Sequence, residues 1–547
     1  MIPLSSVKWG PIDAVDADKD FRFKWMKSRS IEACLQKESW IVSGEKGVGK
    51  TAIRRAIVEI YGDGYLSKPV VDFNEVSFRQ LYDNLLQFAR MTQLSKSTIL
   101  SNFWQYAILV ELIKNCAAKA PLEYGDLVDM HDRFMDESAN SGALAPRKVP
   151  NISDNKMSLP HRLLTLMESL WNTIDDYTRD ATLGTSKPEG KPKNIGSANL
   201  IATSGLTSRL ISEMKTYPIN STFDRIRGLF FERLSQNRHR VILLLDGFDK
   251  LRTDDVSADA VDLIFESLVD AVQSIHSYRD LPEGFEIKAF IPHDRYLSIT
   301  LRDLDKVDTM HVAIRWDRAD LQEFLRKRLE LTPKLNAESF QSLWREVMPE
   351  TVTNTHYKIA EDSFDYLVRH TMMRPRQLQI HLEQLAKHYH GQTIGPAGVT
   401  KSIADSCKAL TRHFITEFKI DHPNLDAFIG SLHGKDNVME FESLVKITQD
   451  ALKRFERGHA RREVLTKIDT LYAMGLFGVV HFIEPGELIG DVYCPPTKES
   501  RRHYVEFFYN NPHPSITSML DEESVVAFHP IFLDYANLNA HPTLIVG

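Results

Sequence analysis

Cysteine is scarce in this chain of 547 residues, and its scarcity excludes two kinds of site. The four cysteines, Cys34, Cys116, Cys407 and Cys494, lie far apart and form no C-x-x-C pair. Disulfide frameworks and structural zinc sites both need clustered cysteines, so neither is expected. We predict reduced thiols, as in a cytoplasmic protein.

Long apolar runs and an excess of basic residues are also missing. No segment approaches the ~18 apolar residues that cross a bilayer, and residues 1–10 lack the apolar stretch of a signal peptide. Lys and Arg number 67 against 74 Asp and Glu, a net charge of −7. This balance argues against a surface built throughout for nucleic acid but leaves one basic patch open. The length predicts about three domains at ~150 residues each, without membrane contact.

A glycine-rich loop near the N-terminus carries the strongest chemical signal. Residues 39–43 form a short, mostly apolar run, and GEKGVGKT follows it at residues 44–51. The loop fits G-x-x-x-x-G-K-[ST] at every fixed position, and the apolar residues after it recur at helical spacing. Strand, glycine loop and helix are the setting of a phosphate-binding loop. The predicted nucleotide-binding residues are Gly44, Lys46, Gly47, Val48, Gly49, Lys50, Thr51 and Ala52.

Each fixed position of this loop has a chemical role. Gly47 and Gly49 permit backbone angles that other residues avoid, so that successive N–H groups point at phosphate oxygens. The following helix adds its positive N-terminal end. Lys50 is predicted to reach the β- and γ-phosphates, and the Thr51 hydroxyl to ligate Mg²⁺. ATP with Mg²⁺ is therefore the expected cofactor pair.

A later strand supplies the predicted metal-binding carboxylate. The segment 240–246 (RVILLLD) contains five consecutive aliphatic residues, as expected of a central parallel strand covered on both faces. Asp246 at its end is predicted to lie beside Thr51 and to hold Mg²⁺ directly or through water. Asp249 is the nearest candidate for the carboxylate that polarises the attacking water; a helix N-cap is the alternative.

The order of strands and helices predicts the fold class and the division of the chain. Further strands are expected at 69–76, 286–291 and 310–316, and they alternate with helices. This alternation predicts an α/β P-loop fold with a mostly parallel sheet and the 286–291 strand beside that of Asp246. The predicted segments are 1–80, the N-terminal part of the ATPase core; 81–235, a mainly helical insertion with exposed loops at 139–155 and 182–197; 236–316, the C-terminal part of the core; 317–420, a helical lid; and 421–547, a winged-helix-like domain.

Several polar residues are candidates for sensing the nucleotide. His293, Asp294 and Arg295 follow the 286–291 strand, where a polar residue would sense the γ-phosphate; for Asp294 an N-cap is the alternative. Arg302 is a candidate arginine finger for a neighbouring subunit, with a solvated surface arginine as the alternative.

The segment Arg374-Pro375-Arg376 precedes a helical pattern, and proline suits the first turn of a helix. Arg376, held there, would lean over the nucleotide and report its state to the lid. An arginine on the surface at a helix start is the alternative.

The C-terminal pattern is typical of a winged helix. Helices are expected at 441–454 and 460–474, followed by a strand from 475 and a glycine turn at 484–486. If the second helix lay in a DNA groove, nearby basic residues would contact phosphates; a protein-contacting winged helix is the alternative. These basic residues are Lys453, Arg454, Arg457, Arg461, Arg462 and Lys467.

At three places the sequence resembles a known group of ATPases. LLLDGFDKL, at residues 243–251, resembles the hhhhDG-h-D form of STAND and NACHT-type ATPases. The R-P-R stretch resembles the G-x-P-R sensor of that group and of origin-recognition AAA+ proteins, with Arg376 matching the pattern's arginine. IRWDRADLQEFLRKRLE is similar to the start of their helical lid, which Trp316 opens. The arrangement looks closest to prokaryotic P-loop ATPases, often encoded among antiviral defence genes, that end in a winged-helix-like domain.

The resemblance covers residues 35–60 and 238–390 well and 421–535 loosely. Two residues depart from the family pattern: Lys250 stands where NACHT proteins usually carry an acidic residue, and Met373 replaces the sensor's glycine. The first departure implies slow hydrolysis, which suits a switch better than a motor.

The resemblance implies a regulatory switch ATPase that acts on a partner effector in trans, such as a nuclease. A homo-oligomer is expected, because a shared nucleotide site needs an arginine from a neighbour. The alternative is a DNA-sensing or DNA-loading ATPase of the origin-recognition type. A third hypothesis, a nuclease with a D…E-x-K metal site at Asp280, Glu286 and Lys288, is disfavoured because its strand is already needed by the nucleotide fold.

Overall fold

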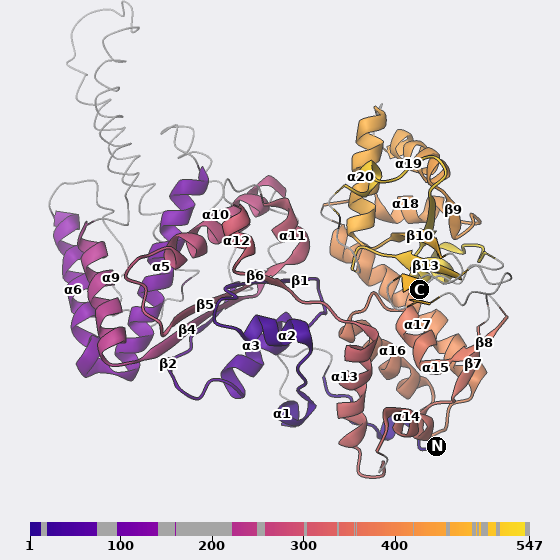
Figure 1. Ribbon diagram of the computed structural model, residues 1–547, viewed down its shortest axis with the longest axis horizontal. Coiled ribbons are helices and arrows are strands. Elements are labelled where there is room, and N and C mark those ends of the chain that lie inside the picture. The colour runs from indigo at the N-terminus through magenta and orange to yellow at the C-terminus, as the bar shows by residue number, and fades with distance from the viewer. Residues whose placement is uncertain are drawn as a thin grey trace, which may run out of the picture. The chain divides into compact units, whose positions relative to one another are not determined.

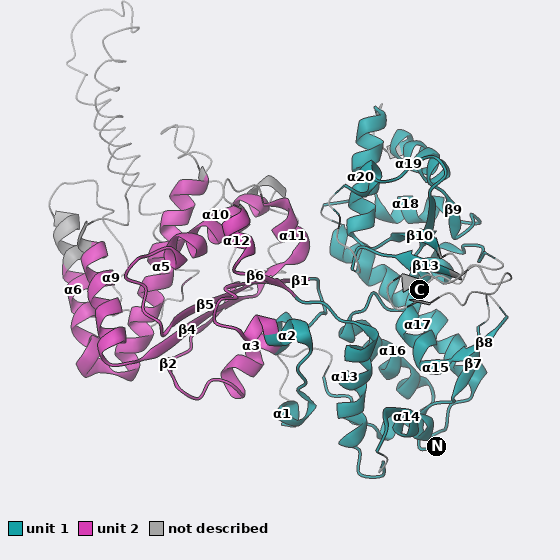
Figure 2. Ribbon diagram, viewed as in Figure 1, with its two compact units in different colours: residues 1–32, 45–52, 314–547 teal, residues 33–44, 53–313 magenta. Residues whose placement is uncertain are grey.

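The computed structural model describes residues 1–11, 19–73, 96–140, 159, 221–248, 258–299, 304–335, 338–354, 356, 358–419, 421–455, 460–483, 488–489, 492–493, 502–509, 513 and 515–541. The chain forms two compact units (Figure 2). The sheet unit comprises residues 33–44 and 53–313, and the lid unit comprises residues 1–32, 45–52 and 314–547. The chain thus enters the lid unit and returns to the sheet unit within the glycine-rich segment.

A parallel β-sheet lies at the centre of the sheet unit. Its order is β2-β4-β5-β1-β6, with β3 also paired to β4, and every pair is parallel. The predicted α/β class with a parallel sheet is confirmed, and so is the position of β5 beside β4. The strands are β1 (Ile41–Gly44), β2 (Tyr65–Ser67), β3 (Val70–Asp72), β4 (Arg240–Asp246), β5 (Phe285–Pro292) and β6 (His311–Ala313).

Two predicted strands are wrong in extent. Instead of one strand over 69–76, two short strands, β2 and β3, flank Pro69, which has no N–H to give to a ladder. The strand expected over 310–316 ends at Ala313, because the chain then leaves the sheet and Asp317 caps a helix.

Helices cover both faces of the sheet. The crossover after β1 and the crossover after β4 run in opposite directions along the sheet, which places α3 on the face opposite α10 (Figure 1). The helix α5 packs against α10, and Trp104 Nε1 donates to Ser267 Oγ at 3.2 Å. The helices are α3 (Lys50–Glu59), α5 (Lys96–Lys119), α6 (Pro121–Asn140), α9 (Ser221–Gln236), α10 (Ala258–His276), α11 (His293–Ser298) and α12 (Leu304–Asp308).

Helix α5 belongs to the core of the sheet unit. Its Phe103, Trp104 and Tyr106 are fully buried in the same apolar cluster as Leu243 and Leu245 of β4. The helix is apolar on all sides, as expected of a buried helix. Helix α6 continues to residue 140, one residue past the start of the predicted 139–155 loop, and the rest of that loop and the 182–197 loop lie outside the described residues.

Between Trp316 and Phe418 the described residues of the lid unit are mainly helical, as predicted, and they include a β-hairpin. A capping box starts its first helix after 316, where Asp320 N–H donates to Asp317 Oδ1 at 2.7 Å. The elements of this part are α13 (Arg318–Glu330), α14 (Phe340–Val347), the hairpin β7 (Thr351–Thr353) and β8 (Ala360–Asp362), α15 (Ser363–Arg369), α16 (Pro375–His388) and α17 (Pro396–Phe418). At its N-terminus the unit adds η1 (Leu4–Ser6), α1 (Phe21–Lys24) and most of α2 (Arg29–Leu35).

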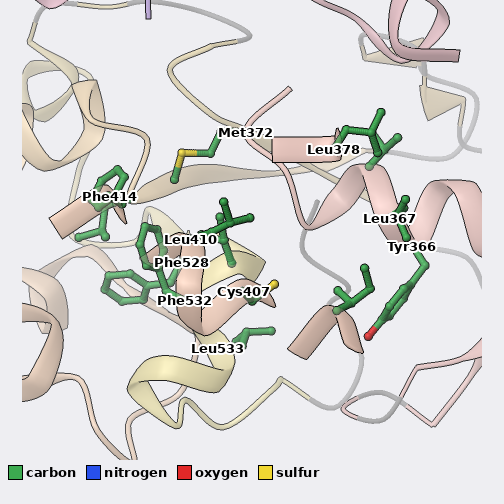
Figure 3. Close-up of a cluster of buried hydrophobic side chains, with 14 of the residues drawn as sticks. Tyr366, Leu367, Met372, Leu378, Cys407, Leu410, Phe414, Phe528, Phe532 and Leu533 are labelled. Atoms are coloured by element: carbon green, nitrogen blue, oxygen red, sulfur yellow. The ribbon is translucent and has the colours of Figure 1, made fainter. Parts of the chain in front are cut away.

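The C-terminal segment shares one core with these helices. Figure 3 shows Phe528, Phe532 and Leu533 beside Leu410 and Phe414 of α17. Two helices and a strand occur in the predicted order, and that strand, β10, belongs to a four-stranded antiparallel sheet of order β13-β10-β14-β9. The elements are α18 (Leu425–Ser431), β9 (Val438–Glu440), α19 (Phe441–Phe455), α20 (Arg461–Ala473), β10 (Phe477–Ile483), β11 (Leu488–Ile489), β12 (Val492–Tyr493), β13 (Arg502–Glu506), η4 (Ile516–Ser518), β14 (Val525–Phe528), η5 (Pro530–Phe532) and α21 (Leu533–Ala536).

In the described part of the chain, no helix is both long and apolar enough to span a bilayer.

Candidate functional site

The glycine loop has the backbone that its motif predicts. Strand β1 ends at Gly44, and α3 begins at Lys50. Gly47 and Gly49 have φ angles of 89° and 106°, in the region that other residues avoid. Lys50 is 5% exposed, and its Nζ donates to the Glu45 carbonyl oxygen at 3.2 Å. The loop therefore turns through two left-handed glycines and carries its lysine at the first residue of a helix.

Three lid residues hold this loop within the lid unit. Trp316 Nε1 donates to the Val48 carbonyl at 2.8 Å, and Arg376 N–H donates to the Gly47 carbonyl at 3.3 Å. A Cβ on Gly47 would lie 3.0 Å from Arg376 Cβ, so a side chain there would clash with the lid as well as strain the backbone. Arg374 forms an ion pair with Glu45.

The start of α16 agrees with the sequence prediction. Pro375 is its first residue, and Arg374 is the N-cap. Met373, where the family pattern has glycine, has a φ of 51°, which explains why glycine suits that position. Arg376 donates its backbone N–H to the loop and packs its side chain near Gly47, and Arg374, in the position that the pattern leaves variable, adds an ion pair with Glu45.

The carboxyl edge of the sheet carries a group of charged residues within the sheet unit. Asp72 of β3 and Asp246 of β4 are register partners at the ends of their strands. Asp246 is 4% exposed; its Oδ1 accepts from Gly247 N–H at 2.8 Å, and its Oδ2 lies 3.3 Å from Arg54 Nε. Arg54 NH1 lies 3.9 Å from Asp72 Oδ2. The strand end therefore presents a carboxylate oriented by a backbone N–H, with an arginine of α3 beside it.

The candidate sensor residues make contacts inside the sheet unit. The buried Ser43 hydroxyl lies 2.8 Å from His293 Nδ1 and 2.7 Å from His311 Nε2. Because a hydroxyl has one proton, at least one of these histidines donates to it. Arg295 is buried and pairs with Asp262 at 2.9 Å. The alternative of Asp294 as an N-cap is wrong, because Pro292 occupies that position and Asp294 lies in the first turn of α11.

Several predictions fall outside the described residues. They concern Asp249, the candidate base; Lys250, the departure from the family pattern; Arg302, the candidate finger; Arg457, one of the basic residues; Cys494; and the glycine turn at 484–486. Their roles stay predictions.

The nuclease hypothesis finds no support in the sheet unit. Glu286 and Lys288 are 2% and 1% exposed on β5. Lys288 Nζ donates to the carbonyls of Ser39, at 2.7 Å, and of Gln36, while Glu286 accepts from the Tyr65 hydroxyl at 2.8 Å. Burial lowers the pKa of Lys288 to about 8. Both side chains are engaged by their own unit and play a structural part.

The basic residues of the C-terminal segment have varied surroundings. Arg461 pairs with Glu442 at 3.1 Å, and Lys453 lies 3.8 Å from Asp450. Lys467 is half-buried, with its Nζ 3.2 Å from His422 Nδ1. Arg454 and Arg462 are exposed. Nearby acidic side chains thus reduce the positive potential that a DNA phosphate would meet at the first two positions.

Sequence reasoning missed two contacts of the site. Glu45 occupies a variable position of the loop motif, so nothing in the motif marks it. Arg54 lies one helical turn after Lys50 on α3, so helix periodicity is the one sequence signal that would place it on the face of α3 toward Asp246. Such contacts depend on which segments the fold brings together.

Comparisons with known proteins add one family match and two structural neighbours. A family model described as the FunZ-associated C-terminal helical domain matches residues 319–405, the segment from α13 into α17. A comparison with curated proteins finds no relative of the chain.

Among solved structures, the chain is similar to the Aeropyrum pernix ORC2 protein. The structure of its ADPNP–ADP complexes is 15% identical with a TM-score of 0.28, and the match covers 57% of this chain and 77% of that one. The structure of its ADP form is 14% identical with a TM-score of 0.23, covering 58% and 76%. TM-scores this low do not establish a shared arrangement, so the proposal below depends on the loop, the strand end and the lid contacts.

Proposed function

We propose that this chain is an ATP-binding and hydrolysing regulatory switch. The observation that carries the proposal is the glycine loop: two left-handed glycines and a helix-starting lysine, with three lid residues in contact with the loop itself. A phosphate-binding loop held by a helical lid suits a protein in which nucleotide state changes the lid.

The loop supplies the recognition of phosphate. Its backbone N–H groups and the N-terminus of α3 provide positive partial charge. When a triphosphate binds, the Lys50 ammonium exchanges the Glu45 carbonyl for phosphate oxygens. Lys50 is almost fully buried, so its charge–phosphate interaction is less screened than it would be in water.

The donor chemistry at the strand end fits Mg²⁺. Asp246 provides a buried carboxylate and Thr51 a hydroxyl, and both are hard oxygen ligands of the kind that Mg²⁺ prefers. Mg²⁺ would neutralise phosphate charge there. Arg54 orients Asp246 from the side of α3, and Asp249 remains the proposed base.

The biological role is proposed from the resemblance. The chain would be a homo-oligomeric switch of a prokaryotic antiviral defence system, with Arg302 reaching a neighbouring subunit and the output passing to a partner effector such as a nuclease. Slow turnover would suit this role, because each ATP molecule then sets the duration of the active state.

The test is ATP turnover by the purified chain, with and without duplex DNA, in wild type, Lys50→Ala and Asp249→Ala. Lys50→Ala should abolish ATP binding, and Asp249→Ala should bind ATP but hydrolyse it more slowly. Lys119→Ala, at an exposed lysine ending α5, is the control and should match wild type. Turnover that both site variants leave unchanged would refute the site assignment.

The DNA arm separates the two candidate functions. Slow turnover that DNA does not change supports the partner-controlled switch. Strong stimulation by DNA, removed by Lys50→Ala, would instead establish the DNA-sensing or DNA-loading ATPase.

A further inference from the structure

Arg374 is a buried cation whose side chain pairs with the phosphate loop. The residue is 3% exposed, and its guanidinium forms an ion pair with the Glu45 carboxylate. Glu45 is a loop residue, and the two positions are 329 residues apart in sequence. A buried arginine needs a partner, because an unpaired charge in the interior is strongly unfavourable. The loop thus completes the charge balance of the lid.

The backbone around Arg374 fixes the direction of its side chain. Met373 before it has a left-handed φ of 51°, and Pro375 after it has a φ restricted by its ring. The Met372 N–H donates to Gln377 Oε1 at 2.7 Å, which closes this turn onto the first turn of α16. These contacts tie the backbone of Arg374 to the first turn of α16.

Glu45 connects this arginine to the phosphate-binding lysine. Its side chain pairs with Arg374, while its carbonyl oxygen accepts from Lys50 Nζ at 3.2 Å and from Val48 N–H at 3.4 Å. One residue therefore contacts the lid through its carboxylate and the lysine through its carbonyl.

A second carboxylate lies near the same arginine. Glu417, near the end of α17, is 3.9 Å from Arg374 NH1. Arg374 Nε is buried and, among the described residues, has no hydrogen-bond partner, so a complete set of bonds does not lock the guanidinium. Burial raises the pKa of Tyr509, and the Glu45 carboxylate adds to the shift, so the C-terminal segment is within electrostatic reach of the pair.

We propose that the Glu45–Arg374 ion pair is the latch through which the lid sets the nucleotide affinity of the phosphate loop, with Glu417 competing for the same arginine. The inference rests on the proposed function, since it assumes that the loop binds nucleotide. With Arg374 on Glu45, the loop is ordered for phosphate. When α17 draws Arg374 toward Glu417, the loop is released and nucleotide affinity falls.

The test measures the Kd of a fluorescent ATP analogue for the full chain and its variants. Glu45→Gln and Arg374→Met should each weaken binding about tenfold, and the double variant should be no weaker than either single variant, because both remove one interaction. Glu417→Gln should change Kd in the opposite direction, by about threefold, because Arg374 is then left to Glu45 alone. Opposite signs would not arise from a general loss of stability.

Arg369→Met is the matched control. Arg369 is another buried arginine of the lid unit, and it forms an ion pair with Glu361 of the β7–β8 hairpin. Its variant should lower thermal stability but leave Kd unchanged. If Arg374→Met fails to fold, the opposite changes of Kd expected for Glu45→Gln and Glu417→Gln still test the latch.

Two outcomes separate failure of the latch from failure of the proposed function. If Lys50→Ala abolishes binding while Glu45→Gln and Arg374→Met leave Kd within about twofold of wild type, the latch is refuted and the nucleotide site stands. If Lys50→Ala binds the analogue as wild type does, the proposed function itself fails.

Discussion

Two carboxylates of the predicted nucleotide site each pair with an arginine. One arginine lies close to the glycine loop in the sequence, and the other lies far from it. Asp246 pairs with Arg54, on the helix that directly follows the glycine loop. Glu45 pairs with Arg374, which the lid supplies. The strand half of the site is therefore organised by its own neighbourhood, whereas the loop half depends on a distant segment. This asymmetry suits the proposed switch, in which the loop half would respond to the lid.

The surroundings of the two arginines sharpen the contrast. Arg374 follows a turn that three buried histidines fasten: His370 lies in it, His381 Nε2 lies 2.8 Å from the His370 carbonyl, and His529 Nε2 lies 3.1 Å from the Thr371 carbonyl. Burial lowers the pKa of all three, to about 4 for His381 and about 3 for His529. Arg54, by contrast, lies near two carboxylates, those of Asp246 and Asp72, and Asp246 also accepts from a backbone N–H.

The largest expected effect is a loss of folding stability at acid pH, caused by the three buried histidines of the lid unit. The folded-state pKa of each histidine lies below the ordinary value of 6.5, so between pH 6.5 and about 4 the unfolded chain binds protons that the folded chain does not. Stability therefore falls as pH falls through this window, by about 1.4 kcal/mol per pH unit for each histidine.

Unfolding measured across pH 4 to 7 tests this slope. His529→Gln keeps a donor and an acceptor but does not titrate, so its slope should be smaller than that of wild type by about one histidine's share. An identical slope in the variant would show that His529 does not contribute to the acid response.

Asp246→Asn should impair ATP hydrolysis through the strand half of the site and leave the lid unit unchanged. If Asp246 holds Mg²⁺ as proposed, loss of its charge should lower kcat with Mg²⁺ on the order of 100-fold. Asp72→Asn is the matched control. Asp72 is the register partner of Asp246, but its side chain is 38% exposed and its Oδ2 lies 3.9 Å from Arg54 Nη1. Equal losses in the two variants would assign the effect to Arg54 and not to Asp246.

Lys288→Met separates buried charge from function. Two carbonyls, of Ser39 and Gln36, would lose their donor, which should cost about 1–3 kcal/mol of stability and leave nucleotide Kd unchanged. The folded-state pKa of Lys288 is about 8, below the ordinary 10.5. Between these values the unfolded chain holds the extra proton, so wild-type stability rises with pH relative to the variant. Denaturant unfolding at pH 7 and pH 10 measures both effects.

The sequence predicts the backbone of the glycine loop and of the Asp246 strand better than it predicts the side-chain contacts that hold them. The aliphatic run before Asp246 and the glycine spacing at 44–51 follow from local chemistry, and the sheet order and glycine φ angles agree with them. The Glu45–Arg374 pair has no local signal, because it joins a variable motif position to a residue 329 positions away. The hairpin β7–β8 and the split of β2 from β3 were missed for the same reason: short strands are fixed by pairing partners more than by their own pattern.

The smallest effect is expected at an exposed ion pair of the same chemical type. Arg318 and Asp365 lie in the lid unit with Nε 2.6 Å from Oδ1, but their side chains are 53% and 47% exposed. Water screens this pair and already solvates both groups, so Arg318→Gln should change stability by less than about 1 kcal/mol and leave Kd unchanged. Thermal unfolding and analogue binding on the same sample test both statements. A loss of affinity like that expected for Arg374→Met would mean that any arginine of the lid affects the loop. The net charge of the lid, and not the Glu45–Arg374 contact, would then explain the effect on Kd. Unchanged affinity would leave burial and direct contact with Glu45 as the properties that give Arg374 its effect.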